Sequence, residues 1–128
     1  IEFASKYDPQ PFHLDDAAAA HSIFGRVAAS GWHTASMTMR MMIDHWNATG
    51  QAIASRGGLG TDELRWPRPV YPGDTLRVEI ELLEKRESKS RPDLGIIRTR
   101  WTVFNQNNEI VMTSLSSGLV ARRPTTNS

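Results

Sequence analysis

The sequence predicts an α+β domain in which a curved antiparallel sheet wraps around one central α-helix. Two observations support this fold class. The helical patterns all precede the strand patterns, and the longest helical segment carries an apolar surface too wide to face water. The 128 residues are enough to bury one sizeable core, and no internal repeat or second compositional region is visible. We therefore expect a single domain over residues 1–128.

The opening of the chain predicts a helix that ends at Asp8. Residues 1–7 place apolar side chains at helical spacing. A proline follows Asp8, which disfavours the α conformation at that aspartate and ends the helix there. Two prolines within residues 8–13 then predict a stiff loop, which holds the side chains at its two ends in a defined relation.

Two more helices are expected before the strands. Asp15 or Asp16 can cap a short helix over residues 17–20. Ser30 is a suitable N-cap for the longest helix, Gly31–Asn47. Along that helix one apolar stripe recurs every three or four positions and should be covered by other structure: Trp32, Ala35, Met39, Ile43 and Trp46.

The second half of the chain predicts strands. Residues 51–73 are interpreted as mostly connection, residues 71–74 as a turn, and the charged residues 84–93 as an exposed connection. The asparagine-rich residues 105–108 predict a hairpin turn. Alternation over residues 76–82 predicts one buried face. Alternating, β-branched and aromatic residues together favour strands over these ranges: 62–66, 76–82, 96–104 and 109–121.

Composition limits the possible classes of function. Fifteen basic and 14 acidic residues give a net charge of +1, which is not the charge excess of a general nucleic-acid-binding protein. The absence of cysteine excludes disulfides, thiol nucleophiles and cysteine-ligated metals. No apolar stretch approaches the length of a membrane span and no signal peptide is evident. We expect a soluble, cytoplasmic protein that binds neither nucleic acid nor membranes.

Asp8 and His13 are the first candidates for chemistry. They stand at the two ends of the proline-stiffened loop, where a carboxylate and an imidazole can hold one water and share acid and base roles. The structural alternative is an aspartate that ends a helix and a histidine that satisfies a backbone group. Spacing alone favours that alternative.

The start of the long helix is the second candidate. Its first N–H groups have no internal partner, so Gly31 can offer an N–H to a polarised carbonyl; close packing is the structural alternative. Ser36 can donate to a ligand or to its own backbone. His21, His33 and His45 are interpreted as structural or surface residues because no pair of them on the helix has metal-ligand spacing, and we expect no metal site.

Three motifs in order resemble the MaoC-like family of hot-dog-fold enzymes. Residues 8–15 carry the D-x-x-P-x-H-x-D arrangement of that family's hydratase motif. Residues 24–31 are similar to its segment before the central helix, and residues 69–76 to its P-V-x-x-G-D lead into the long strands. The resemblance runs from Ile1 to about Val120 and implies the hot-dog fold. It also implies a first strand before the opening helix, so we expect a segment to precede Ile1.

The resemblance implies a function as well. The family contains (R)-specific enoyl-CoA hydratases and related acyl-thioester dehydratases. By this resemblance Asp8 and His13 activate a water that adds to C3 of a trans-2-enoyl thioester, and the Gly31 N–H holds the thioester oxygen. Ser36 falls where the family has a serine in the same pocket. Gln10 and Ser30 lie at the pocket edge, where they depart from the asparagine and histidine that the family often has. We also expect the substrate groove to run beside Trp32. No cofactor is expected besides the CoA or acyl-carrier-protein thioester, which is the substrate.

Two further expectations concern partners. We expect a homodimer or a multiple of it, because a small lone sheet leaves edges unpaired and the family joins two sheets edge to edge. The phosphates of CoA are expected near Arg65, Arg68 or Arg122. Two alternatives stay open: a hot-dog thioesterase that uses the same helix start, and a non-catalytic acyl-thioester-binding subunit. The presence of both Asp8 and His13 favours the hydratase over either.

Overall fold

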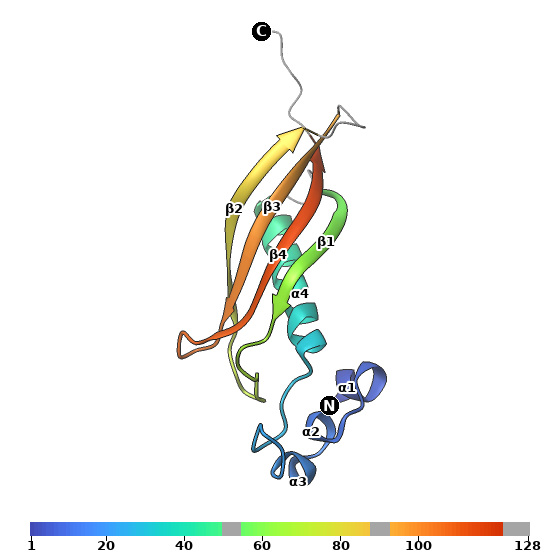
Figure 1. Ribbon diagram of the computed structural model, residues 1–128, viewed down its shortest axis with the longest axis vertical. Coiled ribbons are helices and arrows are strands. Elements are labelled where there is room, and N and C mark those ends of the chain that lie inside the picture. Colours follow the sequence, from blue (N-terminus) through green and yellow to red (C-terminus); the bar gives the residue numbers. More distant parts are fainter. Residues whose placement is uncertain (50–54, 88–92, 122–128) are drawn as a thin grey trace.

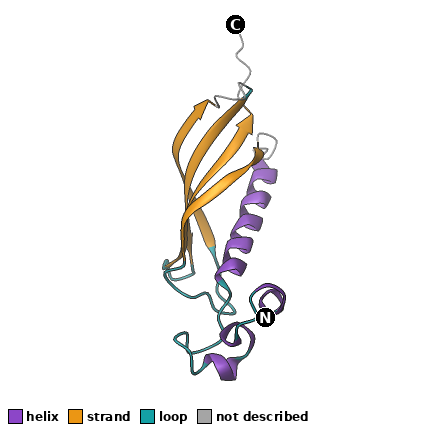
Figure 2. Ribbon diagram, turned by 45° about the vertical axis from the view of Figure 1, so that its right-hand side comes forward, coloured by secondary structure: helices purple, strands orange, loops and turns teal. Residues whose placement is uncertain are grey.

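The computed structural model describes residues 1–49, 55–87 and 93–121, and helices precede strands as predicted. Three short helices come first, α1 (Glu2–Tyr7), α2 (Pro11–Leu14) and α3 (Asp16–Ala19), followed by the long helix α4 (Gly31–Thr49). The strands are β1 (Ser55–Arg65), β2 (Arg77–Glu87), β3 (Leu94–Phe104) and β4 (Ile110–Ala121). Helix α4 runs along one face of the sheet, and α1 to α3 gather beyond the end of the sheet near the first turn of α4 (Figure 1 and Figure 2).

The four strands form one antiparallel sheet in the order β1-β4-β3-β2. Strands β3 and β4 occupy its centre and are joined by the predicted asparagine-rich turn. In that turn the N–H of Asn105 donates to the carbonyl of Glu109 at 3.0 Å. Asn108 takes the left-handed φ of 59°, which asparagine tolerates better than most residues. The predicted α+β class with an antiparallel sheet and a central helix is confirmed.

The core fixes the start of α4 against the segment that leads into β2. Its buried members are Val70, Val103, Val111 and Met112, and partly buried side chains from both segments pack around them. Each fully buried side chain of this size contributes about 1.5–3 kcal/mol to stability. A backbone hydrogen bond adds to this packing, because the N–H of Ala29 donates to the carbonyl of Val70 at 2.7 Å.

The face that α4 buries differs from the predicted stripe. Thr34, Thr38 and Met42 are buried, whereas three members of the stripe are exposed: Trp32 by 57%, Met39 by 46% and Ile43 by 38%. The prediction is therefore wrong for the chain taken alone. Threonine can line the buried face because its hydroxyl is satisfied locally. Thr38 Oγ1, for example, donates to the carbonyl of Thr34 at 2.9 Å.

Two strand predictions also need correction. Strand β1 occupies much of the segment interpreted as connection, and it reaches its length through irregular register against β4. Strand β2 continues through Glu87, into the predicted exposed connection, of which residues 88–92 lie outside the described residues. The predicted buried face of β2 is open beyond Val78, since Ile80 and Leu82 are 39% and 55% exposed. Within the described part of the chain, none of the helices could cross a membrane.

Candidate active site

The end of α1 positions Asp8. Its N–H donates to the carbonyl of Ala4 at 2.8 Å, and the helix ends there as predicted. The expected stiff loop is partly helical, because Pro11 opens α2 at its first position, where a missing N–H costs no hydrogen bond. Helix α2 carries His13, whose residue surface is only 6% exposed. Asp8 and His13 thus come from two short helices that meet at a proline-containing corner.

A backbone carbonyl fixes the His13 ring. Its Nδ1 lies 2.8 Å from the carbonyl oxygen of Ala28. A carbonyl can only accept, so Nδ1 carries the hydrogen, and in the neutral ring Nε2 is left with its lone pair. Ala28 is itself held in place, because its N–H donates to the carbonyl of Phe12 at 3.1 Å. The neutral ring therefore presents a base, not a donor, at Nε2.

Asp8 faces that base. Its Oδ2 lies 3.4 Å from His13 Nε2 and accepts a hydrogen bond of 2.7 Å from Ser30 Oγ. Its Oδ1 accepts another, also of 2.7 Å, from Gln10 Nε2. These two hydrogen bonds, first that of Gln10 and then that of Ser30, hold the pKa of the Asp8 carboxyl below its ordinary value, against a smaller opposing effect of burial. Asp8 is therefore a carboxylate at neutral pH.

With a neutral His13 ring, the two atoms that face each other, Nε2 of His13 and Oδ2 of Asp8, are therefore both hydrogen-bond acceptors. The lone pair of Nε2 and the carboxylate Oδ2 cannot bond directly when His13 is neutral, although 3.4 Å separates them. A water molecule beside both atoms can donate one hydrogen to each, which orients its oxygen lone pairs away from the pair. The structure thus brings Asp8, His13, Gln10 and Ser30 together at one point, and this arrangement suits the activation of water.

Gly31 begins α4 underneath an aromatic ring. A Cβ added to Gly31 would stand 2.5 Å from Cδ2 and Cε2 of Trp66, so the close-packing role considered for this glycine is present. Ser30 is the N-cap, since its Oγ accepts from the N–H of Trp32 at 3.3 Å while donating to Asp8. Among the described residues the Gly31 N–H has no hydrogen-bond partner. That N–H remains available to an acceptor.

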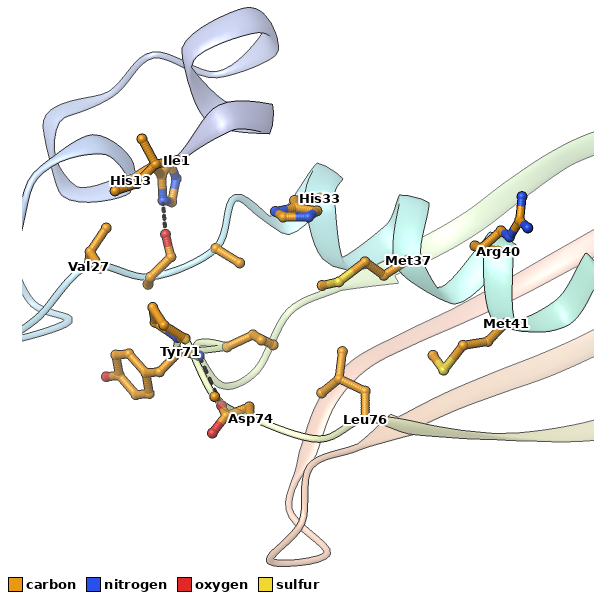
Figure 3. A pocket seen from close by; sticks show the side chains of 15 residues that line it. Ile1, His13, Val27, His33, Met37, Arg40, Met41, Tyr71, Asp74 and Leu76 are labelled. Atoms are coloured by element: carbon orange, nitrogen blue, oxygen red, sulfur yellow. Dashed lines mark hydrogen bonds between the residues drawn. The ribbon is translucent and has the colours of Figure 1, made fainter. Parts of the chain in front are cut away.

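A cavity of about 560 Å³ opens beside His13 (Figure 3). Helix α4 borders it with His33, Met37, Arg40 and Met41, and the facing walls come from three segments: Ile1, Val27–Ala29 and Val70–Asp74 with Leu76. The volume falls within the range of small-molecule sites, and the lining is largely apolar with few polar groups. Such a cavity suits an acyl chain.

The one carboxylate among these lining residues, that of Asp74, is committed to the predicted turn at residues 71–74. Its Oδ2 accepts from the N–H of Tyr71 at 2.9 Å, and its Oδ1 accepts from Gln106 Nε2 at 3.0 Å. Tyr71 in turn donates its hydroxyl to the carbonyl of Phe24 at 2.7 Å. Asp74 therefore shapes the cavity wall, and Asp8 is the carboxylate that has a histidine beside it.

Ser36 and Trp32 lie on a different face of α4 from the cavity. Ser36 Oγ donates to the carbonyl of Trp32 at 2.8 Å, which is the backbone alternative considered for this serine. Trp32 packs edge-on against Trp66, with ring centroids 5.2 Å apart. The cavity instead includes His33, which we interpreted as structural or surface. Helical spacing could have found it, because His33, Met37 and Met41 share one face.

Two of the three arginines expected near CoA phosphates, Arg65 and Arg68, lie within the described residues. Arg65 and Arg68 border a shallow second groove beside β1, and Arg68 Nη1 forms an ion pair with Glu109 at 3.0 Å. Arg122 lies outside the described residues. No group of three or more potential metal ligands occurs within residues 1–49, 55–87 and 93–121.

Comparisons with known proteins place this geometry in context. The family described as "MaoC like domain" matches residues 1–103 of the chain. In sequence, the mesaconyl-CoA hydratase of Cereibacter sphaeroides is 36% identical over 97% of this chain, which spans 30% of that protein's length. The (R)-specific enoyl-CoA hydratase of Aeromonas caviae is 29% identical over 83% of this chain and 71% of its own length.

A solved structure agrees with both the fold and the sequence match. The crystal structure of the MaoC-like dehydratase from Rhodospirillum rubrum is 45% identical to this chain. It aligns with a TM-score of 0.80 over 96% of this chain and 82% of that one. The likeness therefore spans nearly the whole chain, and the residues 1–103 matched by the family include Asp8 and His13.

Proposed function

The chain belongs to the MaoC-like domain family of hydratases and dehydratases, and we propose that it adds water to a trans-2-enoyl thioester or removes it in reverse, with an (R)-3-hydroxyacyl thioester as the other partner. The observation that carries this proposal is the Asp8–His13 pair, whose facing acceptor atoms stand 3.4 Å apart. Two relatives named as hydratases, one for mesaconyl-CoA and one (R)-specific for enoyl-CoA, support it.

The reaction follows from the hydrogen-bond geometry of the pair. A water held by Asp8 Oδ2 and His13 Nε2 forms a bond from its oxygen to C3 of the substrate, and one of its O–H bonds breaks. The pair takes that proton and passes it to C2, where a C–H bond forms, so hydrogen and hydroxyl are both supplied by one water. The negative charge that develops on the thioester oxygen is stabilised by the unpartnered N–H of Gly31. We include no cofactor in this scheme.

The substrate would lie across the mouth of the cavity. Its reacting carbons stand beside His13, and its acyl chain extends along Met37 and Met41. The CoA or acyl-carrier-protein portion stays outside, where Arg65 on the second groove offers a positive charge to phosphate.

We include a homodimer in the proposal. The exposed stripe of α4, the edge strand β1 and the residue that follows β1 together present large apolar side chains to solvent, namely Trp32, Met39, Ile43, Leu59 and Trp66. A monomeric soluble protein rarely leaves such a surface open. In sedimentation experiments, Ile43→Glu should dissociate the dimer and Leu82→Glu, on the opposite edge β2, should not. A monomeric parent chain, or dissociation by Leu82→Glu alone, contradicts this assignment.

The decisive experiment is a hydration assay with two matched variants. Asp8→Asn keeps the shape of the side chain and removes its charge. His13→Asn keeps an N–H that can reach the Ala28 carbonyl and removes the Nε2 base. Each should lower the hydration rate on crotonyl-CoA about 10²–10⁴-fold, the range usual for positioned acid and base groups. His21→Asn, in an exposed loop, is the control and should leave the rate unchanged.

The same assay separates the alternatives. Release of free CoA from saturated acyl-CoA, retained by Asp8→Asn, would identify a thioesterase instead. Tight binding of enoyl-CoA with no turnover by the parent chain would identify a non-catalytic subunit. Hydration that survives in both Asp8→Asn and His13→Asn would refute the proposed mechanism and leave these residues with structural roles.

A further inference from the structure

His33 faces the cavity of Figure 3 and has no part in the mechanism above. It lies on the first turn of α4, and the next residues of α4 on the same wall, Met37 and Met41, are apolar. The remaining polar side chain of α4 at this wall is Arg40, which is mostly exposed and forms an ion pair with Asp44 at 3.2 Å. Of the two polar side chains that α4 contributes to this wall, His33 is thus the one nearer to the helix start, where the thioester would bind.

The His33 ring is held by stacking. It lies nearly parallel to the ring of Phe3 in α1, with centroids 4.8 Å apart and an angle of 14° between planes. Stacking occupies a face of the imidazole and leaves the nitrogens at its edge. Within the described residues neither nitrogen has a hydrogen-bond partner, and no buried side-chain polar atom is left unsatisfied there. The nitrogens are therefore accessible to a ligand.

The ring is also neutral near pH 7. Burial lowers the pKa of His33 below its ordinary value. Its place in the first turn of α4 acts in the same direction, because the positive end of the helix dipole disfavours a cation. A neutral imidazole offers one N–H donor and one lone pair. It can therefore donate to an oxygen of an uncharged or an anionic group.

We propose that His33 is a specificity-determining residue, which hydrogen-bonds an oxygen substituent on C4 of the acyl chain, next to the reacting double bond. This inference rests on the proposed hydratase function. His33 is two positions beyond Gly31, about 3 Å along the helix axis, whereas Met37 is about 9 Å along it. An oxygen on C4 therefore lies level with His33, whereas an oxygen further along the chain lies beyond this ring.

The experiment compares two substrates that differ by one hydroxyl, 4-hydroxycrotonyl-CoA and crotonyl-CoA. The readout is the ratio of their kcat/KM values. His33→Phe preserves an aromatic ring to stack on Phe3 and removes both nitrogens, and it should lower that ratio about 3- to 10-fold, the value of one neutral hydrogen bond. His33→Gln restores a polar atom and should recover part of the ratio. His45→Phe, exposed on the same helix, is the control and should not change it.

Each outcome decides one question. A parent chain that hydrates crotonyl-CoA but does not prefer the hydroxylated substrate overturns the role of His33. An unchanged ratio in His33→Phe does the same and assigns the ring to packing on Phe3, even if both rates fall together. A parent chain that hydrates neither substrate contradicts the proposed function itself.

Discussion

Replacing Gly31 with alanine should drive a methyl group into the ring of Trp66. The added Cβ would lie 2.5 Å from Cδ2 and Cε2 and 2.8 Å from Cε3 of that ring, whereas carbon atoms in contact normally stay about 3.5–4.0 Å apart. These three atoms belong to the rigid body of the indole, so no flexible tip can move aside. The whole ring has to leave its position over the start of α4.

This overlap should lower the free energy of unfolding. Overpacking of this kind destabilises a protein by about 1–3 kcal/mol. For a domain of 128 residues, that loss lowers Tm by about 3–10 °C. The measurement is a thermal melt at one fixed protein concentration, because dimerisation would make Tm depend on it. Gly58→Ala in β1 is the matched control, since an added Cβ there meets no atom within 4 Å.

A double-mutant cycle tests the cause. If the ring is the obstacle, Gly31→Ala should cost about 1–3 kcal/mol less in a Trp66→Ala background than in the parent chain. Additive effects, within about 0.5 kcal/mol, would refute the packing explanation for this glycine. An equal loss of stability in Gly58→Ala would refute it as well, because the penalty would then belong to glycine replacement in general.

The remaining predictions concern the same corner of the molecule. Ser30→Ala removes a hydrogen bond that favours ionised Asp8, so the pKa of Asp8 should rise and the acid limb of kcat/KM should move to higher pH; an unmoved limb contradicts this. Because the pKa of folded Asp8 is lowered, its carboxylate stabilises the fold above the unfolded pKa of about 3.9, and this contribution disappears as pH falls through the folded pKa. Asp8→Asn should therefore lower the free energy of unfolding measured in urea at neutral pH, but change it little in strong acid. A loss that does not depend on pH would contradict a stabilising role for the Asp8 carboxylate. Gly31→Pro in a Trp66→Ala background removes the N–H without the clash and should lower hydration about 10²–10³-fold relative to Trp66→Ala alone, whereas unchanged turnover places the oxyanion site elsewhere.

The sequence predicted local structure well where local rules determine it. The proline after Asp8 ends α1, the hydroxyl of Ser30 caps α4, and the asparagine-rich turn joins β3 to β4. Asp15 caps α3 through the N–H groups of Ala17 and Ala18. Each of these features depends on residues within a few positions of one another, so the sequence displays them directly.

Which face of α4 and which face of β2 is buried could not be predicted from local sequence in the same way. The most apolar stripe of α4 is not the one that its own sheet covers, because the sheet-facing side uses Thr34 and Thr38. Periodicity identifies an apolar stripe but not the surface that will cover it. Likewise, alternation in β2 predicts burial for Ile80 and Leu82, yet both are exposed within this chain, because alternation does not show whether another element covers that face.

The reactive side chains of the candidate site could be predicted from the sequence, but the groups that hold them in position could not. A carboxylate and an imidazole at the ends of a proline-stiffened loop can be recognised in the sequence. The contribution of Ala28 cannot, because it is a carbonyl fifteen positions from His13 whose location depends on the chain returning past α2. The Trp66 ring over Gly31 is equally hidden, since Trp66 follows β1 and is separated from Gly31 in the sequence by all of α4 and β1.

The Ser30 hydroxyl joins two parts of the molecule that are otherwise only lightly connected. It caps α4, which belongs with the sheet, and it bonds to Asp8, which belongs with α1 to α3 beyond the sheet's end. Groups of helices with few contacts to a core tend to open at lower free energy than the core itself. On heating, the reactive geometry would therefore be lost while the sheet is still intact. Loss of turnover would then report detachment of the helical corner, at a lower temperature than the melting of the strands.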